Sequence, residues 1–474
     1  MSNELTIRPG IKNSLVLAIG LGMAVFIAWA TAMGGMVIPV LLAVIAFIIP
    51  FAIAILRNPG LGIISFITYC FCLALLARYI PDFPFTYGIE TLLILSWLGA
   101  LFNAKSYDWQ NLKNELCFLG LIWFIITIME LANPEQGSFA GWISDARYPL
   151  LWLLCIPLCL VIFNTKKDLN IFLGLIIIIS LIGALYGIKQ LKFGLTGAEQ
   201  AFVAKSPTHL IFGKLRIFSF YLDAGQFGAS MAQLSSIALV LALGPFKTWK
   251  RLLLVITGLV LLYGMIISGT RGALFAFFAA MLVSLIITRN TKVFFIGLAI
   301  VAASFVFLKY TSLLNDNAEI RRMRTALKPD DASLNLRLRN QVRLNDYLST
   351  RPFGAGIGAL GYAGKTYNKN TFISTIPPDS YWVKVWAMYG IVGLVIWFGI
   401  MMYILGKCCG IVWKTKDPKL RFKLAALTAG GAGIFICSYG NEVMNNMPSA
   451  MILYISWAFV FLGPKLDKKE VLNY

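Results

Sequence analysis

Long stretches without a charged residue recur along this sequence, and they constrain its fold more than any other feature. The first, roughly residues 14–32, is long enough as a helix to cross the hydrocarbon core of a bilayer, which is about 30 Å thick. Of the 474 residues 59% are hydrophobic and 13% charged, whereas soluble domains contain about 25% charged residues. In a bilayer every backbone polar group needs an internal partner, so the runs predict helices. We therefore expect an all-α, polytopic transmembrane helical bundle that forms a single membrane domain over residues 1–474.

The apolar runs predict about 12–14 membrane-spanning helices, of which the shorter ones, 88–103 and 148–163, are left open as partial spans. No A-x-A-like cleavage site follows the first run, which is therefore expected to be an uncleaved helix rather than a signal peptide. The further expected spans are residues 36–56, 61–78, 88–103, 115–131, 148–163, 169–187, 226–243, 250–268, 272–289, 292–309, 379–407, 421–438 and 446–463.

Lysine and arginine in short loops favour the cytoplasmic side of a membrane. If the N-terminus is cytoplasmic and every span is real, the basic short loops all fall on that side, and so does the C-terminus. These loops contain Arg57, Lys105, Lys166, Lys167, Lys247, Arg251, Arg289, Lys292, Lys407, Lys423, Lys465 and Lys469. The same count places Arg271 and two long loops, 188–225 and 310–378, outside the cytoplasm. The net charge of +20 is then expected to contact anionic lipid headgroups and an anionic substrate rather than nucleic acid.

The second long loop is predicted to contain an amphipathic helix on the membrane surface. Leu334, Leu338 and Val342 recur every four residues, as the apolar stripe of a surface helix does. Arg339 and Arg343 lie one turn apart on the same segment, which makes them candidates for substrate contacts. Basic residues outnumber acidic ones in this loop, and the excess fits either a solvated surface or an anion site.

A glycine-rich segment follows the helix. Residues 351–362, "RPFGAGIGALGY", contain four glycines after a proline, which predicts a series of turns. The glycines suit tight turns, and they equally suit a close approach of backbone amides to a phosphate. The segment lacks the lysine and hydroxyl pattern of a P-loop.

Two arginines are expected at the outer membrane interface, close to helix N-termini. Arg216 precedes the span that begins near residue 226, and Arg271 begins the next but one. Helix N-termini favour anions, and arginine binds phosphate oxygens with paired hydrogen bonds, so the two arginines are candidates for a diphosphate clamp. An arginine at a helix end also occurs where its side chain merely reaches lipid headgroups. Gly269 and Gly272 flank Arg271 and favour the clamp, because they leave room for a ligand.

Asp379 and Ser380 begin a later span on the same side, directly after two prolines. An aspartate there can act as a helix N-cap. It can equally act as a general base for an acceptor hydroxyl, and the residue pattern leaves both roles open.

The sequence gives no sign of a metal or a cofactor. His209 is the only histidine and, in a polar loop, is expected at the surface. No cluster of histidines and no carboxylate pair at metal spacing occurs, and no nucleotide-binding glycine loop is present. The eight cysteines lack paired CxxC spacing and are expected to be small apolar residues.

At these residues the sequence resembles the O-antigen ligase and O-antigen polymerase superfamily. Three segments support the likeness: "LRIFSFYLDAGQFGA", "SGTRGALFAFF", and "RPFGAGIGALGY" followed by "DSYWVKVWAMYGIVG". Ser380, Gly390 and Gly393 fit the spacing of the ligase motif, whereas Asp379 occupies the position of its histidine.

The resemblance implies a metal-independent, GT-C-like glycosyltransferase of the bacterial inner membrane with a periplasmic active site. Its donor would be a glycan on undecaprenyl diphosphate, bound by Arg216 and Arg271. Asp379 would be the base, with Ser380, Gly272, Arg339 and Arg343 as further substrate contacts. The acceptor would be a hydroxyl of a glycan, of lipid A–core or of a protein.

The aspartate in place of the histidine favours a surface-polysaccharide polymerase slightly over a ligase and leaves a protein O-oligosaccharyltransferase open. A transporter or flippase of lipid-linked oligosaccharide is the main alternative, but such proteins place charges deep in the bundle and often contain repeats. A non-catalytic scaffold is a third reading, although it would not need arginines at several helix starts.

Overall fold

The computed structural model consists mainly of long helices, which confirms the predicted all-α, polytopic bundle. Within the described part of the chain, eight helices are long and apolar enough to cross a membrane, and five shorter apolar helices accompany them. The described residues are 37–471 except 82, 206–208, 212–213, 290, 314–315, 317, 326–331, 370 and 378–379, together with 21, 25, 29, 31 and 32. Most of the first predicted span, 14–32, lies outside them.

The N-terminal half of the described chain contributes six long helices and one short helix. They are α2 (Val37–Arg57), α3 (Pro59–Tyr79), α4 (Tyr87–Phe102), α5 (Glu115–Met129), α6 (Phe139–Ile162), α7 (Lys166–Phe193) and α8 (Gly197–Lys205). Short 3₁₀ helices lie at η1 (Ala104–Ser106), η2 (Trp109–Leu112), η3 (Glu130–Ala132) and η5 (Ile373–Thr375). Because α7 extends to Phe193, the long loop predicted from residue 188 begins several residues later.

Helix α6 begins nine residues before the predicted start at residue 148. Ser138 caps it, accepting a hydrogen bond from the backbone N–H of Gly141 at 3.5 Å. Two charged residues lie inside the helix: Asp145 pairs with a lysine of α16, and Arg147 forms a salt bridge with Glu90. Because both are paired with other helices, these charges do not end the span as the sequence suggested.

The C-terminal half contributes the centre of the bundle and the short helices of the second long loop. Its helices are α9 (Ala224–Ala242), α10 (Thr248–Ile267), α11 (Arg271–Ile287), α12 (Thr291–Tyr310), α13 (Ala318–Thr325), α14 (Ala332–Leu348), α15 (Gly361–Tyr367), α16 (Tyr381–Lys414), α17 (Pro418–Cys437), α18 (Ser449–Phe461) and α19 (Gly463–Val471). Strands β1 (Leu210–Ile211) and β2 (Lys214–Leu215) form a small antiparallel hairpin. Helices α9, α17 and α18 are the most enclosed, since nearly all residues of α9, most of α17 and every residue of α18 are buried, so they form the core on which the other helices pack.

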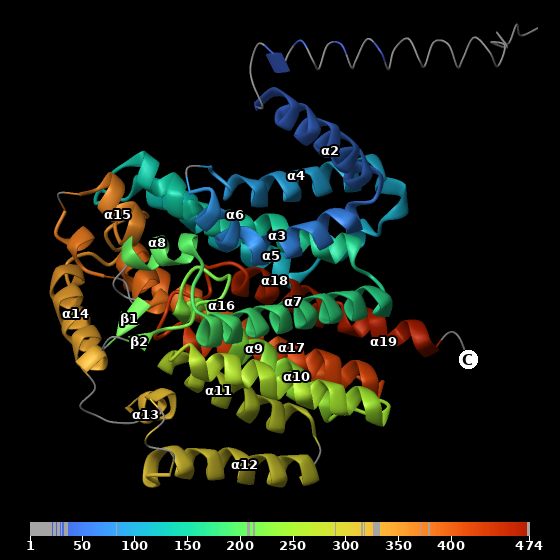
Figure 1. Ribbon diagram of the computed structural model, residues 1–474, viewed down its shortest axis with the longest axis vertical. Helices are drawn as coiled ribbons and strands as arrows, with labels where there is room; N and C mark the ends of the chain where they lie inside the picture. The colour runs from blue at the N-terminus through green and yellow to red at the C-terminus, as the bar shows by residue number, and fades with distance from the viewer. Residues whose placement is uncertain are drawn as a thin grey trace, which may run out of the picture.

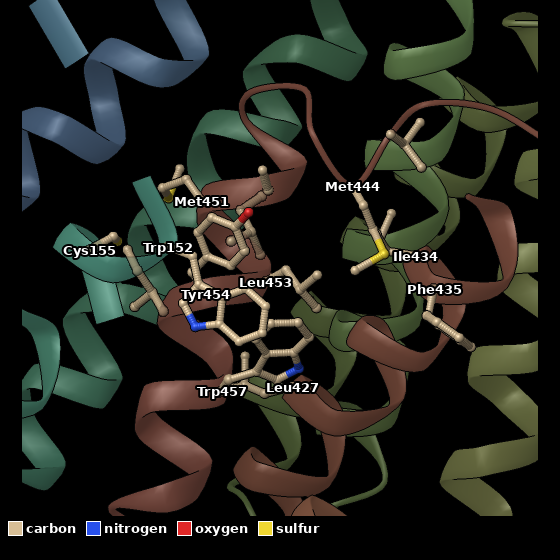
Figure 2. Close-up of a cluster of buried hydrophobic side chains, with 14 of the residues drawn as sticks. Trp152, Cys155, Leu427, Ile434, Phe435, Met444, Met451, Leu453, Tyr454 and Trp457 are labelled. Carbon is tan, nitrogen blue, oxygen red and sulfur yellow. The ribbon is translucent and has the colours of Figure 1, made fainter. Parts of the chain in front are cut away.

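Aromatic side chains fill the core between α6, α17 and α18 (Figure 2). The ring of Trp152 lies 6.1 Å from that of Tyr454 and 5.6 Å from that of Trp457, measured between centroids. Lipid is as apolar as these side chains, so close packing, rather than exclusion from water, holds such helices together.

Helix α16 has a kink, which the glycine-rich segment stabilises. Gly390 has φ +66° inside the helix, which interrupts the regular hydrogen bonding there. The carbonyls of Ala387 and Met388 accept hydrogen bonds from the backbone N–H groups of Ala355 and Gly356, at 2.8 and 3.2 Å. These amides therefore contact the protein's own backbone, which favours the turn role of the segment over phosphate binding.

The two ends of the bundle differ. Helices α8, α13, α14 and α15 and the hairpin gather at one end, while α19 and the C-terminus lie at the other (Figure 1). Near α19, Lys465 pairs with Asp108 at 2.5 Å, and Lys166 pairs with Asp417 at 2.8 Å. Loops whose basic residues predicted a common side therefore meet at one end of the molecule, opposite the end with the long loops.

Candidate active site

A cavity of about 750 Å³ is lined in part by residues of α13, α14 and α15. These helices gather at one end of the bundle (Figure 1). Segments far apart in the sequence supply its charged lining: Asp145, Arg216, Asp223, Arg271, Arg322, Arg337, Lys384 and Glu442. Five of these described side chains are positive and three negative, so the cavity favours an anion.

Arg216 follows β2 and lies against the start of α11. Its backbone N–H donates to the carbonyl of His209 at 2.8 Å, and its Nη2 donates to Oγ1 of Thr270 at 3.2 Å. Its Nε is buried and has no hydrogen-bond partner among the described residues. Burial lowers the pKa of Arg216, and the nearby carboxylate of Asp223 opposes the shift. The guanidinium thus has donor capacity left for a ligand.

Arg78, which the sequence did not single out, fixes the segment that follows Arg216. Its Nη1 donates to the carbonyl of Ser219 at 2.6 Å, and its Nη2 donates to the carbonyl of Tyr221. The guanidinium lies over the rings of Phe202 and Phe218, at 4.8 and 4.5 Å from their centroids. A residue of α3 therefore holds the loop that presents Arg216 to the cavity.

The segment "SGTRG" contains the tight turn between α10 and α11. Thr270, immediately before Arg271, donates from Oγ1 to the carbonyl of Ala224 at 2.8 Å and accepts from Arg216 with the same atom. Its backbone N–H donates to Oγ of Ser268 at 3.1 Å. Arg271 lines the cavity beside Arg216, so the structure brings together the two arginines that the sequence predicted as a pair.

Two further arginines of the long loop line the same cavity, and the sequence did not identify them. Arg322 of α13 packs against Gly269, where an added Cβ would lie 3.0 Å from its Cδ. Burial, together with the positive charges of Arg216 and Arg271, lowers the pKa of Arg322 to about 10. Arg337 of α14 has a buried Nε that lacks a hydrogen-bond partner within the described structure.

Arg339 and Arg343, the candidates chosen from the sequence of α14, do not line the cavity. Arg343 lies over the ring of Phe372, at 5.5 Å from its centroid, and the Nε of Arg339 donates to a carbonyl of its own helix. The helix packs through Leu344 and Leu348, which are buried, and Arg337 lies on that side. Leu338 and Val342 of the predicted stripe are exposed, and the arginine of α14 that lines the cavity is Arg337; a substrate contact by Arg339 or Arg343 stays a prediction.

The remaining predicted residues differ in their positions. Gly272 lines the cavity, and an added Cβ there would make only ordinary contacts, the nearest with Sγ of Cys437 at 3.6 Å. Ser380 is buried and caps α16, accepting from the backbone N–H of Val383 at 3.3 Å. It therefore has a structural role and does not line the cavity. Asp379 lies outside the described residues.

His209 is 3% exposed, so the expectation of a surface histidine was wrong. Its ring packs against those of Phe202 and Phe218, with centroids 4.9 and 5.1 Å away. Burial and the positive charges of Arg216 and Arg78 lower the pKa of His209, and Asp223 opposes them. Phe202 and Phe218 lie only seven and nine residues from His209 in the sequence, but the fold of this loop, rather than a regular spacing, brings their rings onto the histidine.

A cluster of two carboxylates and one lysine lies in the same cavity. Lys384 Nζ is 3.2 Å from Oδ1 of Asp145 and 3.2 Å from Oε2 of Glu442. Asp145 was missed because the sequence placed the start of its helix after it.

An apolar groove of about 430 Å³ adjoins the cavity. Phe275, Leu338, Trp382 and Tyr439 are among its lining residues. It shares with the cavity four residues: Arg271, Gly272, Arg337 and Gly440. Two arginines thus lie where a polar chamber meets an apolar groove, an arrangement suited to a molecule with an anionic group between a polar head and an apolar tail. Among the described residues no group of three His, Cys, Asp or Glu side chains could hold a metal ion.

Comparison with sequence models of protein families gives a match. Residues 256–398 match the sequence model of the O-antigen ligase family, which confirms the resemblance seen in the sequence. The matched region contains Arg271, Arg322, Arg337 and Lys384, whereas Arg216 lies before it. No curated protein matches the chain.

Proposed function

We propose that the chain transfers a glycan from undecaprenyl diphosphate to a hydroxyl acceptor, because residues 256–398 match the O-antigen ligase family and the described helices suit a multi-pass membrane protein. On this proposal it works in the bacterial inner membrane with the cavity at the periplasmic face, and it is a surface-polysaccharide polymerase rather than an O-antigen ligase. The family implies a lipid-linked glycan donor and an acceptor in general terms; the carrier, the acceptor and the side are our proposal.

The position of Arg271 and Arg337 is the observation that supports the donor. Both line the polar cavity and the apolar groove, so a diphosphate bound there would leave its polyprenyl chain in the groove and its sugars in the cavity. Arg216 and Arg322 would add two more cationic groups to the same anion. Arginine suits this task because its planar donors bind phosphate oxygens in pairs and stay charged.

In the proposed reaction the acceptor hydroxyl attacks the anomeric carbon of the donor sugar. The bond from that carbon to the diphosphate oxygen breaks as the new glycosidic bond forms, and negative charge accumulates on the leaving diphosphate. Fixed arginine donors would stabilise this charge more than they stabilise the bound donor, and the loss of one such donor typically costs about 10²–10³ in kcat. No step of this scheme requires a metal ion.

Asp379 remains our proposed base for the acceptor proton. Its ordinary pKa of about 3.9 makes an aspartate a weak base unless burial raises it. It precedes Ser380, whose cap fixes the start of α16, and a carboxylate at this position can take a proton that the ligases' histidine would take.

The orientation follows from the distribution of charge. Basic short loops meet near α19, opposite the cavity, and such loops favour the cytoplasm. A cavity at the end of the bundle also supports a transferase over a transporter, whose substrate site lies near the middle of the membrane.

The test uses purified protein in detergent with EDTA and a synthetic undecaprenyl-diphosphate oligosaccharide. We expect the wild type to release undecaprenyl diphosphate. Arg271→Ala should lower the rate of release at least about a hundredfold, because removing one such hydrogen-bond donor costs about that much in kcat. Arg321→Ala is the matched control, because Arg321 is exposed beside Arg322 and does not line the cavity. Longer lipid-linked products would identify a polymerase, and transfer to added lipid A–core would identify a ligase. No release with either acceptor would contradict the proposal and favour a transporter.

A further inference from the structure

Three charged side chains from separate segments meet in one part of the cavity. Asp145 lies in α6, Lys384 in the first turn of α16, and Glu442 between α17 and α18. The lysine Nζ is 3.2 Å from a carboxylate oxygen of each acidic residue. Two carboxylates share one ammonium, so this cluster has a net charge of −1. The arginine part of the same cavity is positive.

Such a cluster is a costly way to stabilise a membrane protein. The side chains of Asp145 and Lys384 are each 8% exposed, and burying a charge costs several kcal/mol even when it is paired. Charged residues inside membrane helices are retained mainly where they serve a function. Apolar residues of similar volume would hold α6 against α16 at lower cost, so the charges themselves need an explanation.

One oxygen of the cluster lacks a hydrogen bond. Oδ2 of Asp145 is buried and has no partner among the residues described. Leaving a buried acceptor without a donor costs about 1–3 kcal/mol. Because Asp145 lines the cavity, a ligand that supplies an O–H donor there would remove this cost. Glu442 is more accessible than its partners, with a side chain 25% exposed, and it lines the same chamber.

We infer that Asp145, Lys384 and Glu442 form the subsite that binds the hydroxyl groups of the acceptor sugar. This inference rests on the proposed transferase function and adds the chemical class of the acceptor. Ionised carboxylates only accept hydrogen bonds and sugar hydroxyls donate them, while the ammonium donates to sugar oxygens. The net negative charge disfavours an accepting sugar that bears a carboxylate or a phosphate. The subsite therefore selects a neutral sugar, which fits a growing glycan better than a phosphorylated lipid core.

The test separates binding of the acceptor from binding of the donor. The acceptor probe is the oligosaccharide of the synthetic donor, freed from its diphosphate, and its KM is measured at saturating donor. The Kd of undecaprenyl diphosphate is measured separately for each variant. With Glu442→Gln and Asp145→Asn we expect the acceptor KM to rise roughly tenfold to hundredfold, the value of a hydrogen bond to a charged group. The Kd of undecaprenyl diphosphate should stay within about twofold of the wild-type value, because the arginines that bind it are intact.

A second probe reports charge selection, which a merely structural role would not change. It is the same oligosaccharide with its primary hydroxyls oxidised to carboxylates. We expect the wild type to bind this probe at least about tenfold more weakly than the neutral one, and Glu442→Gln to reduce that difference. Glu115→Gln is the control, since Glu115 pairs with Lys407 on the exposed surface of the bundle.

The outcomes are distinct. If Asp145→Asn also weakens the binding of undecaprenyl diphosphate, the substitution disturbs the fold of the protein. Glu442→Gln alone then decides the question. An unchanged acceptor KM in Glu442→Gln would overturn the inference, and so would equal losses of donor and acceptor binding. A wild-type protein that binds undecaprenyl diphosphate but transfers nothing would instead refute the proposed function, and the subsite with it.

Discussion

The replacement of Gly354 by alanine tests how the glycine-rich segment supports the site. Gly354 has φ +81°, which an L-residue adopts at a cost of roughly 1–2 kcal/mol. An added Cβ would lie 2.4 Å from the backbone N of Gly390 and 2.7 Å from the carbonyl of Met388. Neither atom can move without moving the kink of α16, so the segment must withdraw from the helix.

Withdrawal also breaks the two backbone hydrogen bonds that Ala355 and Gly356 donate to α16 at 2.8 and 3.2 Å. Each contributes about 1 kcal/mol, so with the strain the expected destabilisation is about 3–4 kcal/mol. The first turns of α16, which contain Lys384, would then lose their support. We expect Gly354→Ala to lower the unfolding temperature in detergent and to reduce glycan transfer.

Thermal unfolding followed by tryptophan fluorescence, together with the undecaprenyl diphosphate release assay, measures both effects. The control is Gly399→Ala, on the same helix beyond the kink, where nothing lies within 4 Å of an added Cβ. The control should keep wild-type stability and transfer. Wild-type unfolding temperature and transfer in Gly354→Ala would refute the reasoning that this segment supports the kink.

Three further predictions follow from the site and the core. Arg337→Ala should lower transfer at least about tenfold more than Arg339→Ala, because only Arg337 lines the cavity; equal losses would contradict this placement. His209→Gln should flatten the pH dependence of stability. The pKa of His209 is lowered in the folded state, so below about pH 6.5 the unfolded state takes up a proton more readily than the folded state does. The wild type therefore loses stability as the pH falls, and the variant lacks this loss. Parallel unfolding curves for the two proteins between pH 7.5 and 5 would argue against it. Gly433→Val should destabilise the bundle by about 1–3 kcal/mol, because an added Cβ would lie 2.6 Å from the carbonyl of Ala276, and thermal unfolding checks it.

Local patterns predicted much of the fold. Helical spans follow from the length and polarity of apolar runs, because in a bilayer a helix satisfies its backbone within one segment. Helices α9 to α12 accordingly begin and end within about two residues of the predicted spans. The start of α6 was misplaced because Asp145 and Arg147 look like the end of a span in the sequence. Both are paired with residues of other helices.

The site was predicted in part. Arg216 and Arg271 could be chosen from the local sequence, because Arg271 begins a predicted span and Arg216 lies in the segment that leads into another. Arg322 and Arg337 could not be distinguished from the other arginines of the long loop, because residue type gives no information on which face of a short helix packs inward. Arg339 and Arg343 were chosen on α14 because they lie one turn apart, and tertiary packing places Arg337 at the cavity instead.

The sequence by itself determined that this chain is a helical membrane protein, where most of its long helices lie, and that Arg271 begins one of them. Those properties depend on neighbours within a few residues or on the length of one span. Only the tertiary structure decided that Arg216, Arg271, Arg322 and Arg337 line one cavity beside a lysine and two carboxylates. The residues come from segments as distant as 145 and 442, and their meeting depends on how the helices pack, because side chains complementary in shape and charge can be recognised only when both partners are in place.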